Sequence, residues 1–228
     1  MREKAALIAA LVLVFAVILI VFPGGTAQGG TLGDSWLTPS DPQAGDILYF
    51  DNFSSSKSGW PMYTVGEILA DYIDMAYRIT VVPEGGWWWF NARQNFTDFV
   101  MEVEATQISC PDDNAYGVVA RLVDPRSYYM FLISGDGYYS FGALNNSTWI
   151  KPLEWTRSSA INLGNSTNQI KLICKGDLLS FYANGVLLDE YREGTLSYGD
   201  VGLYVRSVKG GNVTVSFDDL RVWKLKRG

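Results

Sequence analysis

Residues 128–144, YYMFLISGDGYYSFGAL, contain two strongly apolar segments on either side of the sequence SGDG at 134–137. Glycine and aspartate accept the backbone angles of a tight turn, so this arrangement predicts a β-hairpin. The segment 128–133 is apolar at every position, which is typical of a strand covered on both faces. One face would pack in the core and the other against a ligand or loops. The hairpin therefore indicates a β protein with a buried central strand.

Short segments of the same kind continue along the chain. Val, Ile, Tyr, Phe and Trp alternate with polar residues at a period of two, and Gly, Asn and Asp separate the segments. A second hairpin is predicted around Asn184-Gly185, a dipeptide that suits a type I′ turn. Because so many strands do not remain in one open sheet, we expect an all-β fold of two packed antiparallel sheets. The predicted strands cover residues 47–53, 76–82, 87–92, 96–109, 115–123, 128–134, 138–144, 169–174, 178–183, 186–191, 201–208 and 213–225.

The long segment 96–109 shows the alternation most clearly. Met101 and Val103 fall on one side of a strand, while Glu102 and Glu104 fall on the other. We expect the apolar side to pack in the core and the acidic side to face water.

Several short motifs follow one another between residues 46 and 225. They are FDNF at 50–53, GW at 59–60, YRI at 77–79, FTDF at 96–99, EVEA at 102–105, DNAYG at 113–117, YYMFLISGDGYY at 128–139, NQIKL at 168–172, LSFYANG at 179–185, GDVGL at 199–203 and FDDL at 217–220. With these motifs in this order the chain resembles the jelly rolls of the concanavalin A-like lectin/glucanase superfamily, including laminin-G-like and 3-keto-disaccharide-hydrolase-like domains. The resemblance implies a two-sheet antiparallel jelly-roll sandwich and contact with sugars, although the superfamily holds lectins, glycosidases and adhesion modules alike.

An uninterrupted apolar segment occupies residues 5–22. A helix of this length rises ~27 Å, close to the hydrocarbon thickness of a bilayer. Arg2 and Lys4 precede it and the next positive residue is Lys57, so the positive-inside rule predicts that the rest of the chain lies outside the cell. Removal as a signal peptide after Ala27, which ends a run of small residues, is the alternative. The predicted organisation is an anchor or signal at 1–22, a Gly- and Pro-rich flexible linker at 23–45 and a β domain at 46–228.

The composition excludes several function classes. The chain has no histidine, which removes Ser-His-Asp and Cys-His catalysis and histidine-ligated zinc. Its net charge is −6 and its cations are scattered, so a nucleic-acid partner is not expected. In an exported protein Cys110 and Cys174 could form a disulfide. The alternative for Cys174 is a small buried residue, because it ends an alternating apolar segment.

Sequences of the type Asn-x-Ser/Thr are frequent in this chain. Together with the export signal they predict N-glycosylation, and the alternative is that Asn, Ser and Thr gather in turns. The predicted acceptors are Asn52, Asn95, Asn145, Asn146, Asn165 and Asn212.

Aromatic residues are the first candidates for ligand contact. Alternation along a strand sends Trp87 and Trp89 to one face and Trp88 to the other, so at least one indole is difficult to bury. An exposed indole is a good platform for the apolar face of a sugar, whereas the alternative is packing in the core. The candidate ligand-binding residues are Trp87, Trp88, Trp89, Tyr138, Tyr139, Trp149 and Trp155.

Glu102 and Glu104 are the candidates for carboxylate catalysis. Their α-carbons would lie about 6–7 Å apart on one strand face, and glycosidases place two carboxyl groups across the scissile bond. Laminarinase-like relatives carry Glu-x-Asp-x-x-Glu on such a strand, but here Gln107 replaces the last acid. The alternative is that both are solvated strand residues.

No cofactor is expected, and calcium is the alternative. Asp112, Asp113 and Asp218 offer hard oxygen ligands, as in some laminin-G-like relatives, and the alternative is that they are ordinary turn residues. The sequence thus predicts a non-catalytic, membrane-tethered module at the cell surface that binds a glycan or a cell-surface protein. A glycosidase-like or 3-keto-disaccharide-hydrolase-like enzyme and a structural envelope protein are the alternatives.

Overall fold

The computed structural model describes residues 44–66, 68–82, 87–109, 111–207 and 211–226. The predicted anchor at 5–22, nearly all of the predicted linker and Cys110 lie outside these residues. Within them there is no helix with the length and apolar character needed to cross a membrane. The first strand begins at Ala44, just before the predicted start of the β domain.

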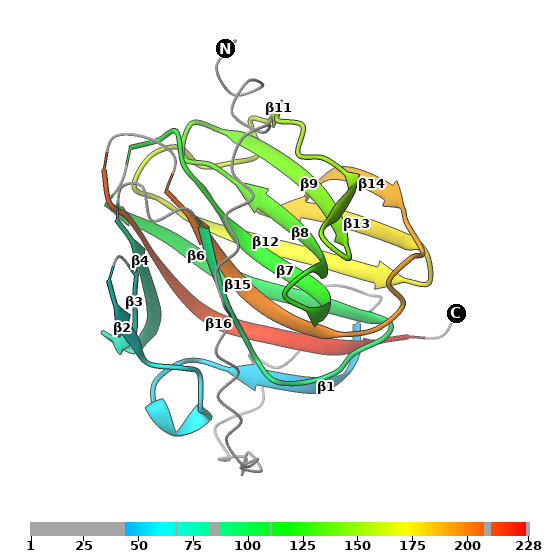
Figure 1. Cartoon of the computed structure of the whole chain (residues 1–228), viewed down its shortest axis with the longest axis horizontal. Helices are drawn as coiled ribbons and strands as arrows, with labels where there is room; N and C mark the ends of the chain where they lie inside the picture. Colours follow the sequence, from blue (N-terminus) through cyan, green and yellow to red (C-terminus); the bar gives the residue numbers. More distant parts are fainter. Residues whose placement is uncertain (1–43, 67, 83–86, 110, 208–210, 227–228) are drawn as a thin grey trace. The chain divides into compact units, whose positions relative to one another are not determined.

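The strands in the described residues form two antiparallel sheets that pack face to face (Figure 1). We call the first the large sheet; its strand order is β14-β13-β12-β6-β16-β4-β3-β2, and β1 also pairs with β16. Its strands are β1 (Ala44–Asp51), β2 (Tyr63–Val65), β3 (Ile68–Ile73), β4 (Ala76–Val81), β6 (Phe99–Ser109), β12 (Thr167–Lys175), β13 (Leu178–Ala183), β14 (Val186–Arg192) and β16 (Val213–Leu225).

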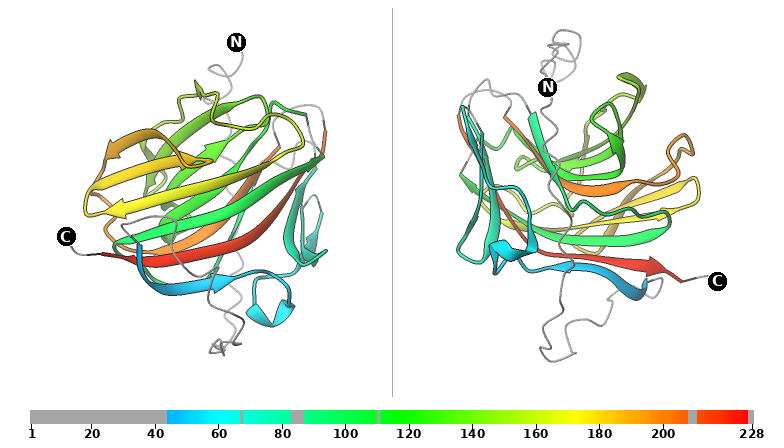
Figure 2. Two further views of the ribbon diagram at one scale, coloured as in Figure 1. Left: turned by 180° about the vertical axis from the view of Figure 1, so that it is seen from behind. Right: turned by 60° about the horizontal axis from the view of Figure 1, so that its bottom comes forward.

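The second, small sheet has the order β10-β9-β8-β7-β15-β5, with β11 also paired to β9. Its strands are β5 (Trp87–Asn91), β7 (Ala115–Asp124), β8 (Ser127–Ile133), β9 (Tyr138–Asn145), β10 (Thr148–Lys151), β11 (Thr156–Arg157) and β15 (Asp200–Arg206). The right view of Figure 2 shows the β9–β10 hairpin and β5 rising from the two edges of this sheet, away from the large sheet. The outer face of the small sheet is therefore concave.

The predicted two-sheet β-sandwich is confirmed, and so are its two hairpins. Between β8 and β9 the Gly137 amide donates to the Ser134 carbonyl at 2.9 Å, which closes the turn at 134–137. Between β13 and β14, Asn184 and Gly185 both have positive φ, at 50° and 79°, as a type I′ turn requires. Local turn chemistry therefore directs both hairpins.

Some strand predictions need correction. The segment predicted to start at 96 enters the large sheet only at Phe99, because Phe96 pairs with Gly199 beside the small sheet and the chain then crosses between sheets. Strands β2, β3, β10 and β11 were not predicted. In β3 the alternation is hidden, since Leu69 and Ile73 are exposed apolar residues beside the buried Ile68 and Ala70.

The core lies between the sheets and is rich in aromatic rings. The ring of Phe181 in β13 lies 4.9 Å from that of Phe131 in β8 and 4.7 Å from that of Phe141 in β9. All three side chains are buried. Burying a side chain of this size contributes about 1.5–3 kcal/mol, so this contact alone joins the layers strongly.

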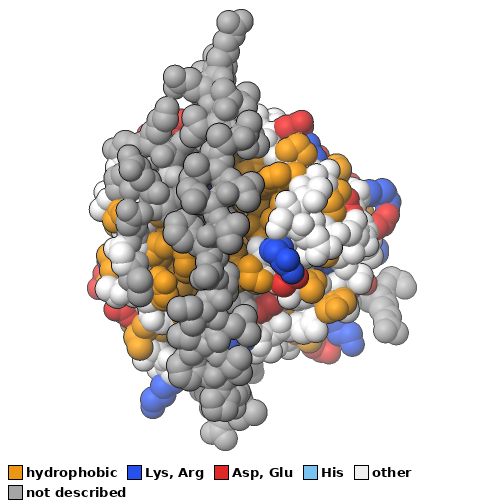
Figure 3. Space-filling model, viewed as in Figure 1, with side chains coloured by type: hydrophobic (Ala, Val, Ile, Leu, Met, Phe, Trp, Pro, Cys, Tyr) orange, Lys and Arg blue, Asp and Glu red, His pale blue; other side chains and the backbone are white. Residues whose placement is uncertain are grey.

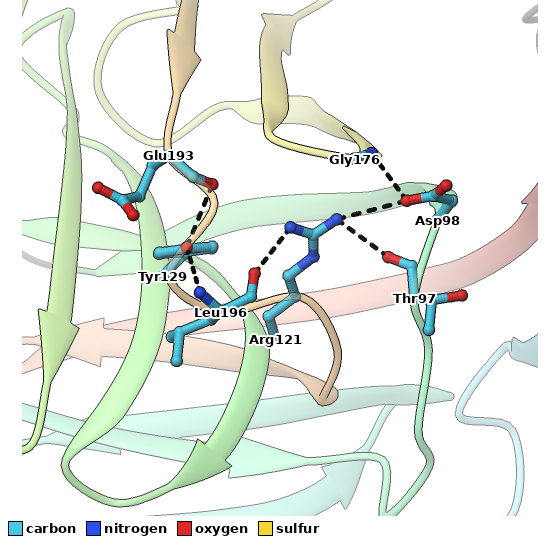
Figure 4. A network of polar contacts seen from close by, with 7 residues as sticks. All are labelled: Thr97, Asp98, Arg121, Tyr129, Gly176, Glu193 and Leu196. Carbon is cyan, nitrogen blue, oxygen red and sulfur yellow. Dashed lines mark hydrogen bonds and ion pairs between the residues drawn. The ribbon is translucent and has the colours of Figure 1, made fainter.

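Arg121 is a charged residue inside the sandwich (Figure 4). A bulge in the β7–β15 pairing gives it a positive φ of 47° and directs its side chain inward. The guanidinium donates to the carbonyl oxygens of Leu196 at 2.8 Å and Thr97 at 3.2 Å, and lies 3.5 Å from the Asp98 carboxylate. Asp98 also accepts from the Gly176 amide at 2.8 Å. Arg121 therefore holds three connecting segments together at one end of the sandwich.

Strand β16 joins the two ends of the described chain. One edge pairs with β6, and the other pairs with β4 over Val213–Phe217 and with β1 over Leu220–Leu225. Asp219, with φ 51°, forms the irregularity where the partner changes. Ala44 stands opposite Leu225, so the first and last described strands are direct neighbours.

Candidate functional site

The concave outer face of the small sheet collects apolar and aromatic side chains. Tyr204 of β15 pairs with Gly117 of β7 on one side and with Trp89 of β5 on the other, while Val119 of β7 pairs with Met130 of β8. Together with neighbours from β8 to β11 these residues form a second apolar cluster, separate from the core. Figure 3 shows hydrophobic side chains gathered on this side of the molecule. We call this surface the aromatic face.

The predicted tryptophan block divides as the alternation requires. Trp89 is half-buried on the aromatic face, with its ring 6.3 Å from that of Tyr128. Trp88 points the other way and stacks on Tyr63 at 5.4 Å, packed against the core. Trp87 belongs to β5, but its side chain lies outside what the structure describes.

Trp149 is the most accessible of the candidate rings whose side chains the structure describes. It stands opposite Leu144 in the β9–β10 pairing and is 40% exposed. It lies over Gly142, because a side-chain carbon at that glycine would come within 3.0 Å of the indole. Trp155 is half-buried in the cluster of the aromatic face. Two indoles of the β9–β11 region and one of β5 therefore flank the same concave surface.

The two tyrosine candidates separate in the same way. Tyr138 is on the aromatic face, opposite Arg157 in β11, and is half-buried. Tyr139 points inward, and its hydroxyl donates to the Leu188 carbonyl of the large sheet at 3.0 Å. Of the predicted aromatic residues with described side chains, Trp89, Trp149, Trp155 and Tyr138 share the outer surface, whereas Trp88 and Tyr139 belong to the core side.

The predicted ligand-binding residues did not include the centre of the aromatic face, although the segment 128–133 was expected to be covered on both faces. Tyr128, Met130 and Tyr204 occupy this centre and are each at most 3% exposed. Burial raises the pKa of the Tyr204 hydroxyl well above its usual range, although the positive charge of Arg206 opposes the shift. The signal for Tyr204 was its place in the alternation of 200–206, two residues after a glycine with no side chain on that face.

A buried acid lies at one end of the aromatic face. Asp200 is 6% exposed and accepts hydrogen bonds from the Asn91 side chain at 2.5 Å and from the Val201 amide at 2.7 Å. Burial raises the pKa of its carboxyl, while the hydrogen bonds favour the charged form. These contacts tie β15 to the end of β5, so Asp200 shapes the surface rather than facing a ligand.

The candidate catalytic acids lie elsewhere. Glu102 and Glu104 are on the outer face of the large sheet, on the opposite side of the sandwich from the aromatic face. The prediction that both face water is wrong for Glu102, which is 4% exposed and stands in register with Lys171 and Arg221. Only Glu104 is exposed. Glu102 therefore lies between two cations in the strand register, away from the indoles.

The structure does not bring the calcium candidates together. Asp112 accepts from the Gln107 side chain at 3.0 Å, and Gln107 points between the sheets. Asp218 lies on the outer face of the large sheet beside Glu104. Asp113 is an exposed turn residue. Among the described residues, no three acidic or thiol side chains are grouped so that they could hold a metal ion.

Cys174 has a free, fully buried thiol, and burial raises its pKa to about 12. It stands opposite Phe99 at the start of β6. Cys174 is therefore a small buried residue, as its place at the end of an alternating segment predicted. Cys110 lies outside the described residues, and a disulfide between the two stays a prediction.

The predicted glycosylation acceptors differ in exposure. Asn52 is half-buried and accepts from the Ser54 hydroxyl at 2.8 Å, and Asn145 is half-buried in β9. The other acceptors are exposed: Asn95, Asn146, Asn165 and Asn212. Their modification remains a prediction.

Two hollows lie away from the aromatic face. One of about 440 Å³ is lined by Gly45, Asp46 and the end of β16. The other, of about 370 Å³, is also lined by the end of β16, together with Lys175 and residues 95–98. Neither contains a predicted aromatic or acidic site residue. The outer surface of the small sheet, where Trp89, Trp149 and Trp155 surround a buried apolar centre, is thus the candidate binding site.

Comparison with known proteins supports the fold assignment. No protein-family model matches the chain, and no curated protein matches it in sequence. Among solved structures, carbohydrate-binding module CBM66 from Bacillus subtilis is similar, with a TM-score of 0.59 and 15% identity over 73% of this chain and 98% of that one. A protein of unknown function with a galectin-like fold, also from Bacillus subtilis, has a TM-score of 0.63 and 14% identity over 81% and 99%. The β-glucanase of Bacillus licheniformis has a TM-score of 0.55 and 12% identity over 81% and 100%.

Such low identities show the fold alone. The chain has the fold of the concanavalin A-like lectin/glucanase superfamily, as the sequence motifs predicted.

Proposed function

We propose that this chain is a non-catalytic module that binds carbohydrate through the aromatic face of its small sheet. The observation that carries the proposal is the placement of Trp89, Trp149 and Trp155 on one concave surface. A carbohydrate-binding module is among the proteins of similar fold, which supports the same proposal.

The physical basis is stacking. The apolar C–H face of a sugar ring packs against an indole, and the indole N–H remains free to donate a hydrogen bond. Trp149 is 40% exposed and so offers its ring without rearrangement. Trp89 and Trp155 are half-buried and held by their neighbours, so their rings are already ordered before binding.

We further propose that the module acts at the cell surface, anchored through residues 5–22. The uninterrupted apolar segment, the positive residues confined to its N-terminal side and the exposed glycosylation sequences support this location. A flexible linker would then let the β domain reach ligands beyond the membrane.

A glycan array probed with the full chain in a non-ionic detergent tests the binding proposal. We expect binding to oligosaccharides, and the variant Trp149→Ala should weaken it by about tenfold or more, since one stacked ring contributes on the order of 1–3 kcal/mol. Met62→Ala is the matched control, because Met62 is 65% exposed beside β2 on the large sheet. A blank array, or equal loss in both variants, would contradict the proposal and favour a structural envelope role.

Glycoside hydrolysis is the alternative function, because an endo-β-galactosidase and a β-glucanase have similar folds. Glu102 is buried between cations on the other sheet, which argues against a catalytic pair with Glu104. We expect no release of reducing sugar from any glycan that binds. Turnover that disappears in Glu104→Gln would establish the enzyme instead.

A further inference from the structure

Arginine side chains have different surroundings on the two sheets. The large sheet pairs Arg78 with Asp74 at 3.0 Å, Arg192 with Asp177 at 2.8 Å and Arg221 with Asp219 at 3.0 Å, measured between nitrogen and oxygen. Arg157 and Arg206 of the small sheet have no carboxylate partner within the residues that the structure describes. An unpaired guanidinium keeps all its donors available for a ligand.

Both unpaired arginines lie on the aromatic face, in one row across the sheet. Arg157 stands opposite Tyr138, and Arg206 stands opposite Ala115. The register between these positions continues through the end of β8, so the row crosses β11, β9, β8, β7 and β15. Four strand spacings separate the two backbones by ~19 Å. The two cations therefore bracket one end of the aromatic face.

Each arginine is close to an aromatic residue of the same surface. Arg206 follows Tyr204 by two positions on β15 and its charge acts on the Tyr204 hydroxyl. Arg157 is the direct cross-strand neighbour of Tyr138. Asp136, in the turn before Tyr138, accepts a hydrogen bond from the Ser134 hydroxyl within its own turn. A ligand stacked on the face would thus meet two guanidinium groups at this end, with the Asp136 carboxylate of the intervening turn already engaged by Ser134.

We infer that the aromatic face selects acidic polysaccharides, whose carboxylate or sulfate groups pair with Arg157 and Arg206 while sugar rings stack on the indoles. This inference rests on the proposed carbohydrate-binding function. Guanidinium is planar and forms two parallel hydrogen bonds to a carboxylate or sulfate, which a neutral hydroxyl does not match. The spacing of the two cations suits a run of sugars rather than a single terminal one.

The overall charge of the protein makes the local cations decisive. With a net charge of −6 the chain repels a polyanion at long range. Selection for an acidic ligand therefore depends on the few unpaired positive groups at the site, and we expect it to weaken as salt screens them.

Titration calorimetry of the full chain in a non-ionic detergent tests the inference with matched polymers. The carboxylate arm compares polygalacturonate with its methyl ester, and the sulfate arm compares dextran sulfate with dextran. We expect about tenfold tighter binding of at least one acidic polymer than of its neutral twin at low salt, because a charge-assisted hydrogen bond is the stronger kind. The double variant Arg157→Gln/Arg206→Gln should remove this difference.

Arg192→Gln is the matched control, since Arg192 is an exposed arginine of the large sheet. It should keep the preference, and the thermal midpoints of the variants show that each is folded. Equal affinity for acidic and neutral polymers, or a preference that survives the double variant, would overturn the inference while carbohydrate binding stands. Binding of no polymer or glycan at all would overturn both proposals.

Discussion

The outer faces of the two sheets present opposite surfaces to the solvent. On the large sheet, Glu102 stands between Lys171 and Arg221, and Lys171 lies 4.4 Å above the ring of Tyr182. On the small sheet, indoles surround a buried centre, and Arg157 and Arg206 have no carboxylate partner in the part of the chain that the structure describes. Charges that satisfy one another stabilise a face, whereas aromatic rings and free donors leave a surface that a ligand completes. The comparison indicates which side of the sandwich binds.

The largest effect is expected where an arginine of the small sheet is turned inward. Arg121→Met leaves the Leu196 and Thr97 carbonyls without their donor. Leaving these carbonyls unsatisfied should lower the free energy of unfolding by about 1–3 kcal/mol for each. Denaturant titration measures this loss of stability. Arg157→Met, at an exposed position, should stay within about 0.5 kcal/mol of the native protein, and similar losses in both would contradict the comparison.

Substitutions on the outer face of the large sheet should change the stability of the protein but not its affinity for glycans. Glu102→Ala removes the carboxylate between two cations, and Lys171 is 9% exposed, so we expect a loss of about 2–3 kcal/mol. Glu104→Ala, on the same face of the same strand but exposed, should change little. Glycan affinity should be unaltered in both folded variants. A lower glycan affinity of the folded Glu102→Ala variant would indicate that the large sheet, rather than the small sheet, binds the glycan.

Each face also carries a carboxyl whose pKa is raised chiefly by burial, Asp200 on the small sheet and Asp218 on the large sheet. The folded protein therefore holds these protons more tightly than the unfolded chain. Their contribution to stability is complete below the unfolded pKa of ~3.9 and is lost as pH rises through the folded value.

We consequently expect the stability contributed by these two carboxyls to fall as pH rises above ~3.9, measured by thermal unfolding from pH 4 to pH 7 at matched salt. Asp200→Asn and Asp218→Asn should each flatten the pH dependence, because an amide does not titrate. A pH dependence that is unchanged in both variants would contradict the burial argument.

The smallest expected effect comes from removing one serine hydroxyl on each sheet. Ser180 donates to the Glu190 carboxylate at 2.7 Å on the large sheet, and Ser140 donates to the Glu154 carbonyl at 2.9 Å beside Trp155. Replacing either by alanine should cost about 1 kcal/mol. Only Ser140→Ala should also weaken glycan binding, because it loosens the segment that carries Trp155. Equal glycan affinities of the Ser140→Ala and Ser180→Ala variants would show that Trp155 is not part of the binding site.

The parts of the fold that follow from neighbouring residues were predictable. The turn residues at 134–137 and 184–185 predict their hairpins, and alternation in β6 predicts that Met101 and Glu102 point to opposite faces. The burial of Glu102 was not predictable, because its partners Lys171 and Arg221 come from distant strands. Arg121 enters the core through a bulge that no local pattern indicates.

The candidate site was predictable only as a set of residue types. Alternation shows that Trp88 and Trp89 point to opposite sides, but it does not show which side faces outward. That choice depends on register with β15 and on the position of the large sheet. Tyr204 was missed because a single tyrosine in an apolar strand looks like a core residue until the second sheet is placed.

The pairing of β1 with β16 determines how the domain carries mechanical load. A pull transmitted through the backbone into Ala44, along the axis of β1, acts on the hydrogen bonds to β16 together, in shear, rather than one after another. β16 is in turn bonded to β6 through the middle of the large sheet. A force between the N-terminal side and a ligand held on the small sheet would therefore be spread over many bonds before any strand peels away.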